Sequence, residues 1–349
     1  MGNDDFANTR RSGTRIMTRR IAINGFGRIG RGVLRVLLER DIDLEMIAVN
    51  DLTDGRTLAH LLEWDSVYGR LSDRIGFDED ELFIGDRRIK VFAEPDPAKL
   101  PWGELGIDVV LESTGRFTKA VDARKHLEAG AKRVLVSAPA DGADLTVVVG
   151  VNDDLYDPEQ HEIISNASCT TNAFAPLAQV LDELAGIEQG FMTTVHAYTQ
   201  DQNLIDGPHK DPRRARAAAL NIVPTSTGAA KAIGLVLPKL DGKLSGTSMR
   251  VPVPVGSIVE LNAAVSREVT REEVLEAYRR AATSGRLSGV LEYSEDPLVS
   301  SDIVGNPHSS IFDSELTQVH GKHVKVTSWY DNEWGFSNRA AEMLEKLSV

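Results

Sequence analysis

The residue best suited to covalent chemistry is Cys169, the only cysteine in the 349-residue sequence. It lies in the run Ser-Asn-Ala-Ser-Cys-Thr-Thr-Asn (residues 165–172), and a helix-like pattern follows at residues 173–184. Thiolates rather than thiols are nucleophiles, and the N–H groups and dipole of a helix N-terminus lower the pKa of a thiol. A lone cysteine is often only a small buried apolar residue. The hydroxyl residues on both sides of this sulfur favour the nucleophile instead.

A reactive thiol needs a proton acceptor, and His196 is the best placed of the eight histidines. It ends residues 192–196, whose alternating pattern predicts a strand, and imidazole titrates near neutral pH. A strand-end histidine taken alone is more often structural, but together with a lone cysteine it favours a catalytic pair. His209 is the next candidate, because it lies in the long segment 197–221, and ordered loops of that length are usually functional.

A glycine pattern lies between a predicted strand at residues 20–24 and a predicted helix at residues 32–40. Gly25, Gly27 and Gly30 form G-x-G-x-x-G, which permits a tight turn, close approach to a pyrophosphate and close helix–strand packing. Asp51 follows the next predicted strand, about 20 residues beyond Gly30, where a carboxylate accepts ribose hydroxyls and repels a 2′-phosphate. A tight turn alone would explain the glycines, but the strand, helix and acid together predict NAD binding.

A thiol beside a nicotinamide restricts the plausible reactions. Addition of the sulfur to an aldehyde gives a hemithioacetal, whose hydride can pass to a nicotinamide and leave a thioester. A histidine then takes the hydroxyl proton, because its pKa lies near neutrality.

Other elements must position these groups. Thr114 and Ser137 follow predicted strands, where open α/β sheets place ligands, although both could be ordinary turn residues. Residues 224–231 begin a helix with hydroxyls and a glycine, which favours anion binding, and Arg250 is a candidate phosphate ligand. The other predicted strands are 46–50, 107–111, 133–136, 146–151, 163–164, 249–254, 259–265 and 322–329, and the other predicted helices are 122–129, 272–281 and 338–347.

The composition limits the function classes. The net charge of −13 argues against nonspecific nucleic-acid binding. One cysteine excludes an internal disulfide framework and fits a reducing cytoplasm, and without C-x-x-C or H-E-x-x-H we predict no metal site. No window approaches the ~18 consecutive apolar residues of a membrane helix, so we predict no membrane partner. Residues 1–19 lack the apolar core of a secretory signal, and we expect a disordered extension there.

Five stretches together resemble the phosphorylating glyceraldehyde-3-phosphate dehydrogenases. They are Asn-Gly-Phe-Gly-Arg-Ile-Gly-Arg (24–31), the run around Cys169 (165–172), Thr-Thr-Val-His (193–196), Arg-Arg-Ala-Arg-Ala (213–217) and Ser-Trp-Tyr-Asp-Asn-Glu (328–333). The match runs from about residue 20 to the C-terminus, and the cysteine run is highly specific to the family.

The resemblance implies a homotetrameric, cytoplasmic enzyme of glycolysis or gluconeogenesis. Such an enzyme converts glyceraldehyde 3-phosphate, phosphate and NAD to 1,3-bisphosphoglycerate and NADH. Cys169 would be the nucleophile, and His196 would activate the thiol and act as the base. Thr199 and Arg250 would hold the substrate phosphate. The resemblance assigns the inorganic phosphate to Ser168, Thr170, Thr227 and Gly228, and NAD to Arg28, Ile29, Asp51, Ser137 and Asn332.

The fold expected on this basis is α/β, with a Rossmann-type NAD-binding domain and an α+β catalytic domain. We expect the NAD-binding domain at residues 20–168 and the catalytic domain at residues 169–335. A C-terminal helix within residues 336–349 would return to the NAD-binding domain.

Two positions depart from the family pattern. Many members carry a second cysteine four residues after the first, where this chain has Ala173, so a disulfide between the two is impossible. Pro95 stands where members often have an arginine near the adenine, which removes one cofactor contact and leaves relaxed use of NADP open.

Three other functions compete with this reading. An erythrose-4-phosphate dehydrogenase shares the fold and the thiol mechanism. A semialdehyde dehydrogenase is disfavoured by the anion-binding features at residues 225–231 and Arg250. A non-catalytic NAD-binding or RNA-binding protein is disfavoured by the pair Cys169 and His196 and by the acidic composition.

Overall fold

The first part of the chain alternates strands and helices. The structure, a computed structural model, describes residues 19–40 and 42–348. The extension predicted at residues 1–19 lies outside them, except for Arg19, which begins the first strand one residue earlier than expected. The strands here are β1 (Arg19–Asn24), β2 (Leu44–Asn50), β3 (Trp64–Asp65), β4 (Gly69–Arg70), β5 (Ile75–Asp78), β6 (Glu81–Ile84), β7 (Arg87–Phe92), β8 (Val109–Glu112), β9 (Arg133–Val136), β10 (Leu145–Thr146) and β11 (Ile163–Ser165); the helices are α1 (Arg28–Glu39), α2 (Gly55–Glu63), α3 (Ala120–Ala123) and α4 (Lys125–Glu128).

These strands form a doubly wound sheet. Within the described residues, nine of them lie in the order β10-β11-β9-β8-β1-β2-β7-β6-β5. β1 pairs in parallel with β2 on one side and with β8 on the other, so the winding reverses at β1. Ligands bind beyond the carboxyl ends of the strands at such a reversal. The structure therefore places the glycine-rich turn after β1 at the expected binding edge.

Two predictions for this region were wrong in detail. The strand expected at residues 146–151 is only the two-residue β10, and the helix expected at residues 122–129 is divided between α3 and α4. The antiparallel edge β5-β6-β7 was missed altogether. β5 and β6 have only four residues each, and β7 carries three basic residues, so the three strands give little of the extended apolar signal that predicts a strand.

The second part of the chain forms a mixed sheet. Within the described residues, the strand order is β13-β14-β12-β15-β19-β17-β16, with β18 paired to β19. The strands are β12 (Ile187–Ala197), β13 (Val223–Ser226), β14 (Leu244–Val251), β15 (Ser257–Val265), β16 (Leu291–Ser294), β17 (Ser310–Asp313), β18 (Gln318–His320) and β19 (His323–Tyr330); the helices are α5 (Cys169–Ala185), α6 (Ala229–Val236), α7 (Arg271–Thr283) and α8 (Trp334–Leu347). Short 3-10 turns lie at Pro97–Lys99, Asp153–Leu155 and Pro238–Leu240.

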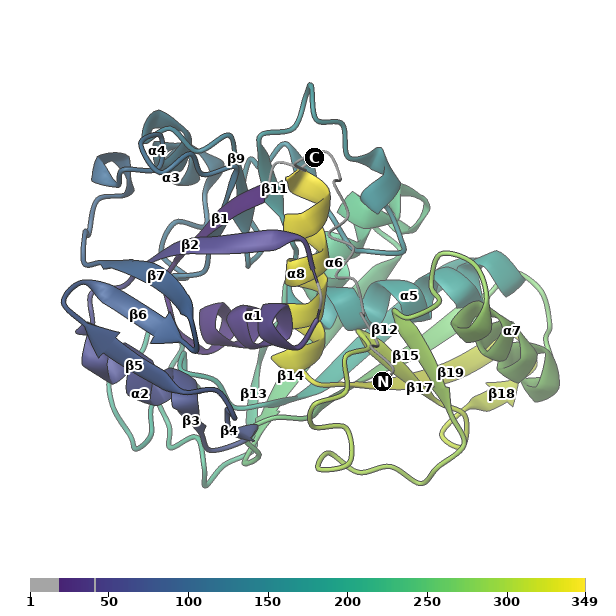
Figure 1. The fold of residues 1–349 in the computed structure, drawn as a ribbon. Coiled ribbons are helices and arrows are strands. Elements are labelled where there is room, and N and C mark those ends of the chain that lie inside the picture. The colour runs from purple at the N-terminus through teal and green to yellow at the C-terminus, as the bar shows by residue number, and fades with distance from the viewer. Residues whose placement is uncertain (1–18, 41, 349) are drawn as a thin grey trace, which may run out of the picture.

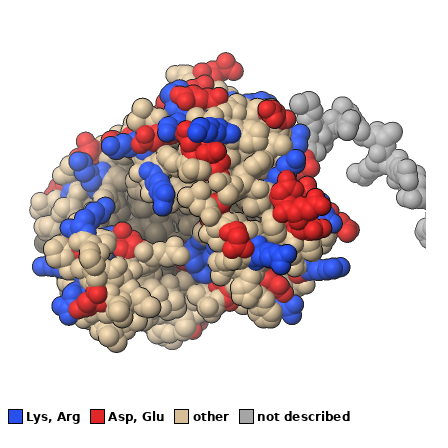
Figure 2. All heavy atoms as spheres, turned by 90° about the vertical axis from the view of Figure 1, so that its left-hand side faces the viewer, with Lys and Arg blue, Asp and Glu red and all other residues tan. Residues whose placement is uncertain are grey.

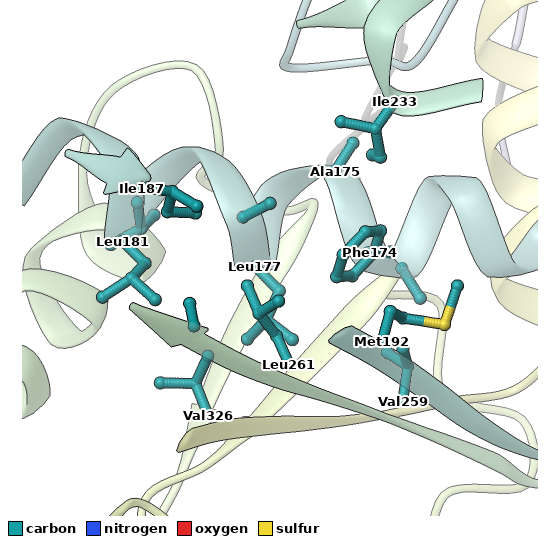
Figure 3. Packing of buried hydrophobic residues seen from close by; sticks show 14 of the residues in the cluster. Phe174, Ala175, Leu177, Leu181, Ile187, Met192, Ile233, Val259, Leu261 and Val326 are labelled. Atoms are coloured by element: carbon teal, nitrogen blue, oxygen red, sulfur yellow. The ribbon is translucent and has the colours of Figure 1, made fainter. Parts of the chain in front are cut away.

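Helix α5 is the centre of the second core. Phe174, Leu177 and Leu181 are fully buried, and they lie toward Leu261 and Val326 of the sheet (Figure 3). Truncating one such leucine to alanine typically costs about 2–5 kcal/mol. A helix held this firmly against a sheet fixes the position of its first residue, Cys169.

Helix α8 returns to the first sheet and packs on α1 (Figure 1). The helices approach closely at Gly32, because a Cβ atom there would lie 2.6 Å from the Oγ of Ser337. The predicted fold class, a Rossmann-type domain with an α+β domain and a returning C-terminal helix, is confirmed. In the described part of the chain, helices are too short or too polar to cross a bilayer.

Candidate active site

A cavity of about 1000 Å³ lies beyond the carboxyl ends of β1, β2, β8 and β9 and reaches Cys169 and His196. One face of the molecule is visibly hollowed, with Lys and Arg side chains beside the hollow (Figure 2). Of the predicted site residues, the cavity is lined by Gly25, Gly27, Arg28, Ile29, Asp51, Ser137, Ser168, Cys169, His196, Thr199 and Asn332. Gly30, Thr170, Thr227, Gly228 and Arg250 lie outside that lining.

The loop before Cys169 is fixed by its own residues. Ser168 is the N-cap of α5, and its Oγ accepts a hydrogen bond from the Thr171 N–H at 3.0 Å. The Nδ2 of Asn172 donates to the carbonyl of Ser168 at 3.0 Å. Ala167 has a φ of +56°, a left-handed conformation that costs an alanine of the order of 1–3 kcal/mol. The strain sets the chain direction just before the sulfur.

The thiol and the imidazole are in contact. The Sγ of Cys169 lies 3.4 Å from the Nε2 of His196, which is 4% exposed and is the last residue but one of β12. Burial, reinforced by the charge of Arg250, lowers the pKa of His196 to about 3, so the imidazole is neutral at physiological pH. A neutral ring in this place can accept a proton from the sulfur or its adduct.

The expected acidification of the thiol is wrong. Burial raises the pKa of Cys169, and this outweighs the lowering by Arg250 and by hydrogen bonds to Thr170. Sequence motifs show the helix N-terminus but not the depth at which it lies. With a neutral imidazole in contact, the sulfur becomes nucleophilic as its proton passes to Nε2.

Arg250 contacts the far side of the base. Its Nη1 lies 2.8 Å from the Nδ1 of His196 and 2.9 Å from the carbonyl oxygen of Ala197. The same Nδ1 lies 2.7 Å from that carbonyl. A protonated Nδ1 donates to the carbonyl and leaves Nε2 free to accept a proton, whereas an Nδ1 that accepts from Arg250 requires the proton on Nε2. Arg250 thus bears on which tautomer the base adopts.

Tyr330 is a site residue that the sequence reasoning missed. Its ring packs edge-on against His196 with centroids 5.9 Å apart. Its hydroxyl lies 2.9 Å from the Oγ1 of Thr170 and 2.8 Å from the Oγ1 of Thr194. Thr170 is therefore engaged inside the protein. Tyr330 lies within one of the family-like motifs, but no residue-level signal gave it a role.

The glycine-rich turn fits a dinucleotide. Gly25 has a φ of +93°, and a Cβ atom there would lie 2.5 Å from the backbone nitrogen of Thr114. At Gly30 it would lie 2.4 Å from the carbonyl oxygen of Gly25, whereas at Gly27 no atom lies within 4 Å. Gly27 lines the cavity at the start of α1, so its missing side chain leaves the helix N-terminus open to a phosphate.

Asp51 and Asn332 present polar groups to the same cavity. The carboxylate of Asp51 accepts the Phe26 N–H at 2.8 Å, which joins the end of β2 to the glycine turn. The Oδ1 of Asn332 accepts the Gly256 N–H at 3.2 Å. A backbone N–H can only donate, so this contact fixes the amide orientation and directs Nδ2 toward the cavity.

The Arg28 side chain is held within the protein rather than free for the cofactor. Its Nε lies 3.0 Å from both carboxylate oxygens of Glu333, and it also pairs with Asp65. Nearby, the Tyr68 hydroxyl donates to Asp331 at 2.9 Å. These contacts join the start of α1 and residues 65–68 to the start of α8. Any contact of Arg28 with NAD falls to its backbone N–H, as for Ile29.

Thr227 and Gly228 lie at the N-terminus of α6, where Thr227 Oγ1 accepts the Ala229 N–H at 3.2 Å. Gly228 is exposed. In the described residues, no group of three His, Cys, Asp or Glu side chains could hold a metal ion. The anion role of Thr227 and Gly228 stays a prediction.

Comparison with known proteins gives two family matches. Residues 19–120 match the model described as glyceraldehyde 3-phosphate dehydrogenase, NAD binding domain, and residues 168–332 match that of the C-terminal domain. A glyceraldehyde-3-phosphate dehydrogenase from Kitasatospora aureofaciens is 72% identical over 330 residues, which cover 95% of this chain and 99% of that protein. Similar relatives of the same name occur in Streptomyces coelicolor (59% identical, 94% and 98% covered) and Mycobacterium bovis (59% identical, 94% and 98% covered).

Proposed function

The chain belongs to the glyceraldehyde-3-phosphate dehydrogenase family, and from that premise we propose how its own residues carry out the reaction. It is an NAD-dependent oxidoreductase that acts on an aldehyde. The substrate is glyceraldehyde 3-phosphate, with inorganic phosphate as the second acceptor and 1,3-bisphosphoglycerate as the product. Erythrose 4-phosphate is not favoured, because the relatives reported above carry the three-carbon name.

The thiol of Cys169 adds to the aldehyde carbon and forms a hemithioacetal. His196 Nε2 takes the hydroxyl proton as that carbon loses its hydride, for which bound NAD would supply the acceptor, and a thioester remains on the sulfur. Inorganic phosphate then attacks the thioester, the product leaves as an acyl phosphate, and the sulfur regains a proton from His196. The contact of 3.4 Å between Sγ and Nε2 is the observation that carries this assignment.

Arg250 links substrate binding to the base. Thr199 lies in the cavity lining, and Arg250 lies behind His196, so a phosphate held between them would draw the guanidinium away from Nδ1. The carbonyl of Ala197 would then be the partner of Nδ1, which favours the tautomer with Nε2 free. Ser168, Thr170, Thr227 and Gly228 are the proposed ligands of inorganic phosphate, and the Thr170 hydroxyl would have to leave Tyr330 to serve as one.

The assay that tests this function follows NADH formation with purified protein, glyceraldehyde 3-phosphate and phosphate. We expect turnover that needs both phosphate and NAD. The same assay with erythrose 4-phosphate is the control. Phosphate-independent turnover that prefers the four-carbon sugar would overturn the assignment.

Asp51 supports the preference for NAD over NADP, with the backbone of Arg28 and Ile29, Ser137 and Asn332 as the other proposed contacts. Its carboxylate lies at the end of β2 beside the glycine turn and would repel a 2′-phosphate. Pro95 also lines the cavity and offers no side-chain donor there, so the charge of Asp51 carries most of the discrimination.

The segment between β12 and β13 supports a homotetramer. Leu204, Ile205, Leu220 and Ile222 are between 67% and 80% exposed, although they are large and apolar. Such a group is typical of a surface covered by another subunit. Light scattering of the wild type and of Leu220→Asp tests this, with dissociation expected in the variant. A wild-type monomer would refute it.

The proposed setting is the cytoplasm, in glycolysis or gluconeogenesis. The single cysteine, left as a thiol at the site, suits a reducing compartment. We propose that residues 20–168 form the NAD-binding domain, onto which the C-terminal helix (336–349) returns. Residues 169–335 form the catalytic domain, which carries the covalent chemistry.

A further inference from the structure

Ser257 is buried and does not line the cavity, yet its hydroxyl lies between Ala197, which follows the base His196, and the amide of Asn332. It is 0% exposed and begins β15, the strand between β12 and β19. β12 ends with His196 and Ala197, and Asn332 follows the end of β19. The first residue of β15 therefore lies beside both His196 at the end of β12 and Asn332 just after β19.

The hydroxyl makes one hydrogen bond in each direction. The Ser257 Oγ accepts the Ala197 N–H at 3.1 Å and donates to the Oδ1 of Asn332 at 3.0 Å. On the first side, the carbonyl of Ala197 is the partner of His196 Nδ1 at 2.7 Å. On the second side, Oδ1 is held away from the cavity, so Nδ2 faces it.

We propose that Ser257 is a positioning residue for hydride transfer, which keeps the base His196 and the nicotinamide-facing amide of Asn332 in one fixed arrangement. This rests on the proposed function, in which Asn332 Nδ2 contacts the nicotinamide carboxamide. Ser257 touches neither substrate nor cofactor. It acts through the Ala197 peptide on one side and the Asn332 amide on the other.

The neighbouring backbone explains why a serine serves here. Gly256 has a φ of +96°, and a Cβ atom there would lie 2.4 Å from the carbonyl oxygen of Ser300, so the turn into β15 is closely confined. The Gly256 N–H also donates to Asn332 Oδ1, at 3.2 Å, a longer distance than the 3.0 Å of the Ser257 hydroxyl. Without the hydroxyl, that oxygen keeps one donor, and the Ala197 N–H loses its acceptor.

The test compares Ser257→Ala, Asn332→Ala and the double variant in steady-state assays with varied NAD. We expect Ser257→Ala to lower kcat about 10-fold, since a lost buried hydrogen bond is worth ~1–1.5 kcal/mol. We also expect a raised KM for NAD and an unchanged KM for the aldehyde. If Ser257 acts through Asn332, its loss should have a much smaller effect on kcat in the Asn332→Ala background.

Ser310→Ala is the matched control, because Ser310 is also fully buried and bonds to Ser328 at 2.6 Å, outside the cavity lining. Both serine variants should lose a similar amount of thermal stability, but only Ser257→Ala should lose activity. The proposal is overturned if the two variants lose activity equally, or if the effects of Ser257→Ala and Asn332→Ala on kcat are additive. Failure of the wild type to oxidise the aldehyde would instead refute the proposed function itself.

Discussion

Replacing Gly25 or Gly27 by alanine should separate the two duties of the glycine turn, folding and cofactor binding. At Gly25, the φ of +93° costs an L-residue about 1–2 kcal/mol, and overlap with the Thr114 backbone nitrogen adds about 1–3 kcal/mol. Gly25→Ala should therefore destabilise the fold by about 2–5 kcal/mol. At Gly27, no atom lies within 4 Å of the new Cβ, so the free energy of unfolding should change by less than about 1 kcal/mol.

Gly27→Ala should keep the fold stable but weaken the binding of NAD. The added methyl of Gly27→Ala projects where a pyrophosphate would meet the N-terminus of α1. Losing one hydrogen bond to a charged group costs about 1.5–3 kcal/mol, so NAD should bind at least about 10-fold more weakly.

Two measurements on the same preparations check this. One is urea unfolding monitored by tryptophan fluorescence, and the other is titration with NAD. The variant pair is its own control, because both changes add one methyl to the same turn. Gly27→Ala that binds NAD like the wild type, or that unfolds as readily as Gly25→Ala, would refute the reasoning.

Three further substitutions test the chemistry. Cys169→Ser should abolish aldehyde oxidation while NAD binding stays near the wild-type level, and substantial turnover would exclude the thiol mechanism. His196→Asn should lower kcat by about 10²–10⁴-fold. The same variant should show a weaker dependence of the free energy of unfolding on pH. The pKa of His196 is about 3 in the folded protein and 6.5 ordinarily, so the neutral imidazole contributes its full stabilisation above pH 6.5 and loses it as the pH falls toward 3. An unchanged stability profile would mean that His196 is not buried as a neutral ring. Asp51→Asn should shift the ratio of kcat/KM values toward NADP by about 5-fold or more, because like charges ~4 Å apart repel by about 1 kcal/mol in water and more near a protein; an unchanged ratio would place the discrimination elsewhere.

The sequence predicted the groups whose chemistry is local. Cys169 beside a helix start, Asp51 after a strand and the three glycines are all recognisable from residue type and spacing, and the structure brings Cys169 and His196 together. The extra strands β5, β6 and β7 escaped prediction because an edge hairpin with exposed charge lacks a strong apolar alternation.

Properties that depend on long-range packing could not be predicted. The raised pKa of Cys169 comes from desolvation of a sulfur that lies against His196, 27 positions further along the chain. Tyr330 and Ser257 act through contacts with residues 60–160 positions away, and a serine or tyrosine within a strand gives no sign of such partners. The family-like motif at residues 328–333 contains Tyr330 but gives no sign of its hydrogen bonds to Thr170 and Thr194.

The pairing of Arg28 with Glu333 and Asp65 has a consequence for how the dinucleotide is exchanged. The three side chains are only 9–26% exposed, so dissolved salt screens their attraction poorly. They fasten the start of α1 to the start of α8, beside the Tyr68–Asp331 bond. Because α8 also packs on α1, these contacts brace one wall of the cavity, which Arg28 and Glu333 both line, and NAD is exchanged against a wall that stays in place.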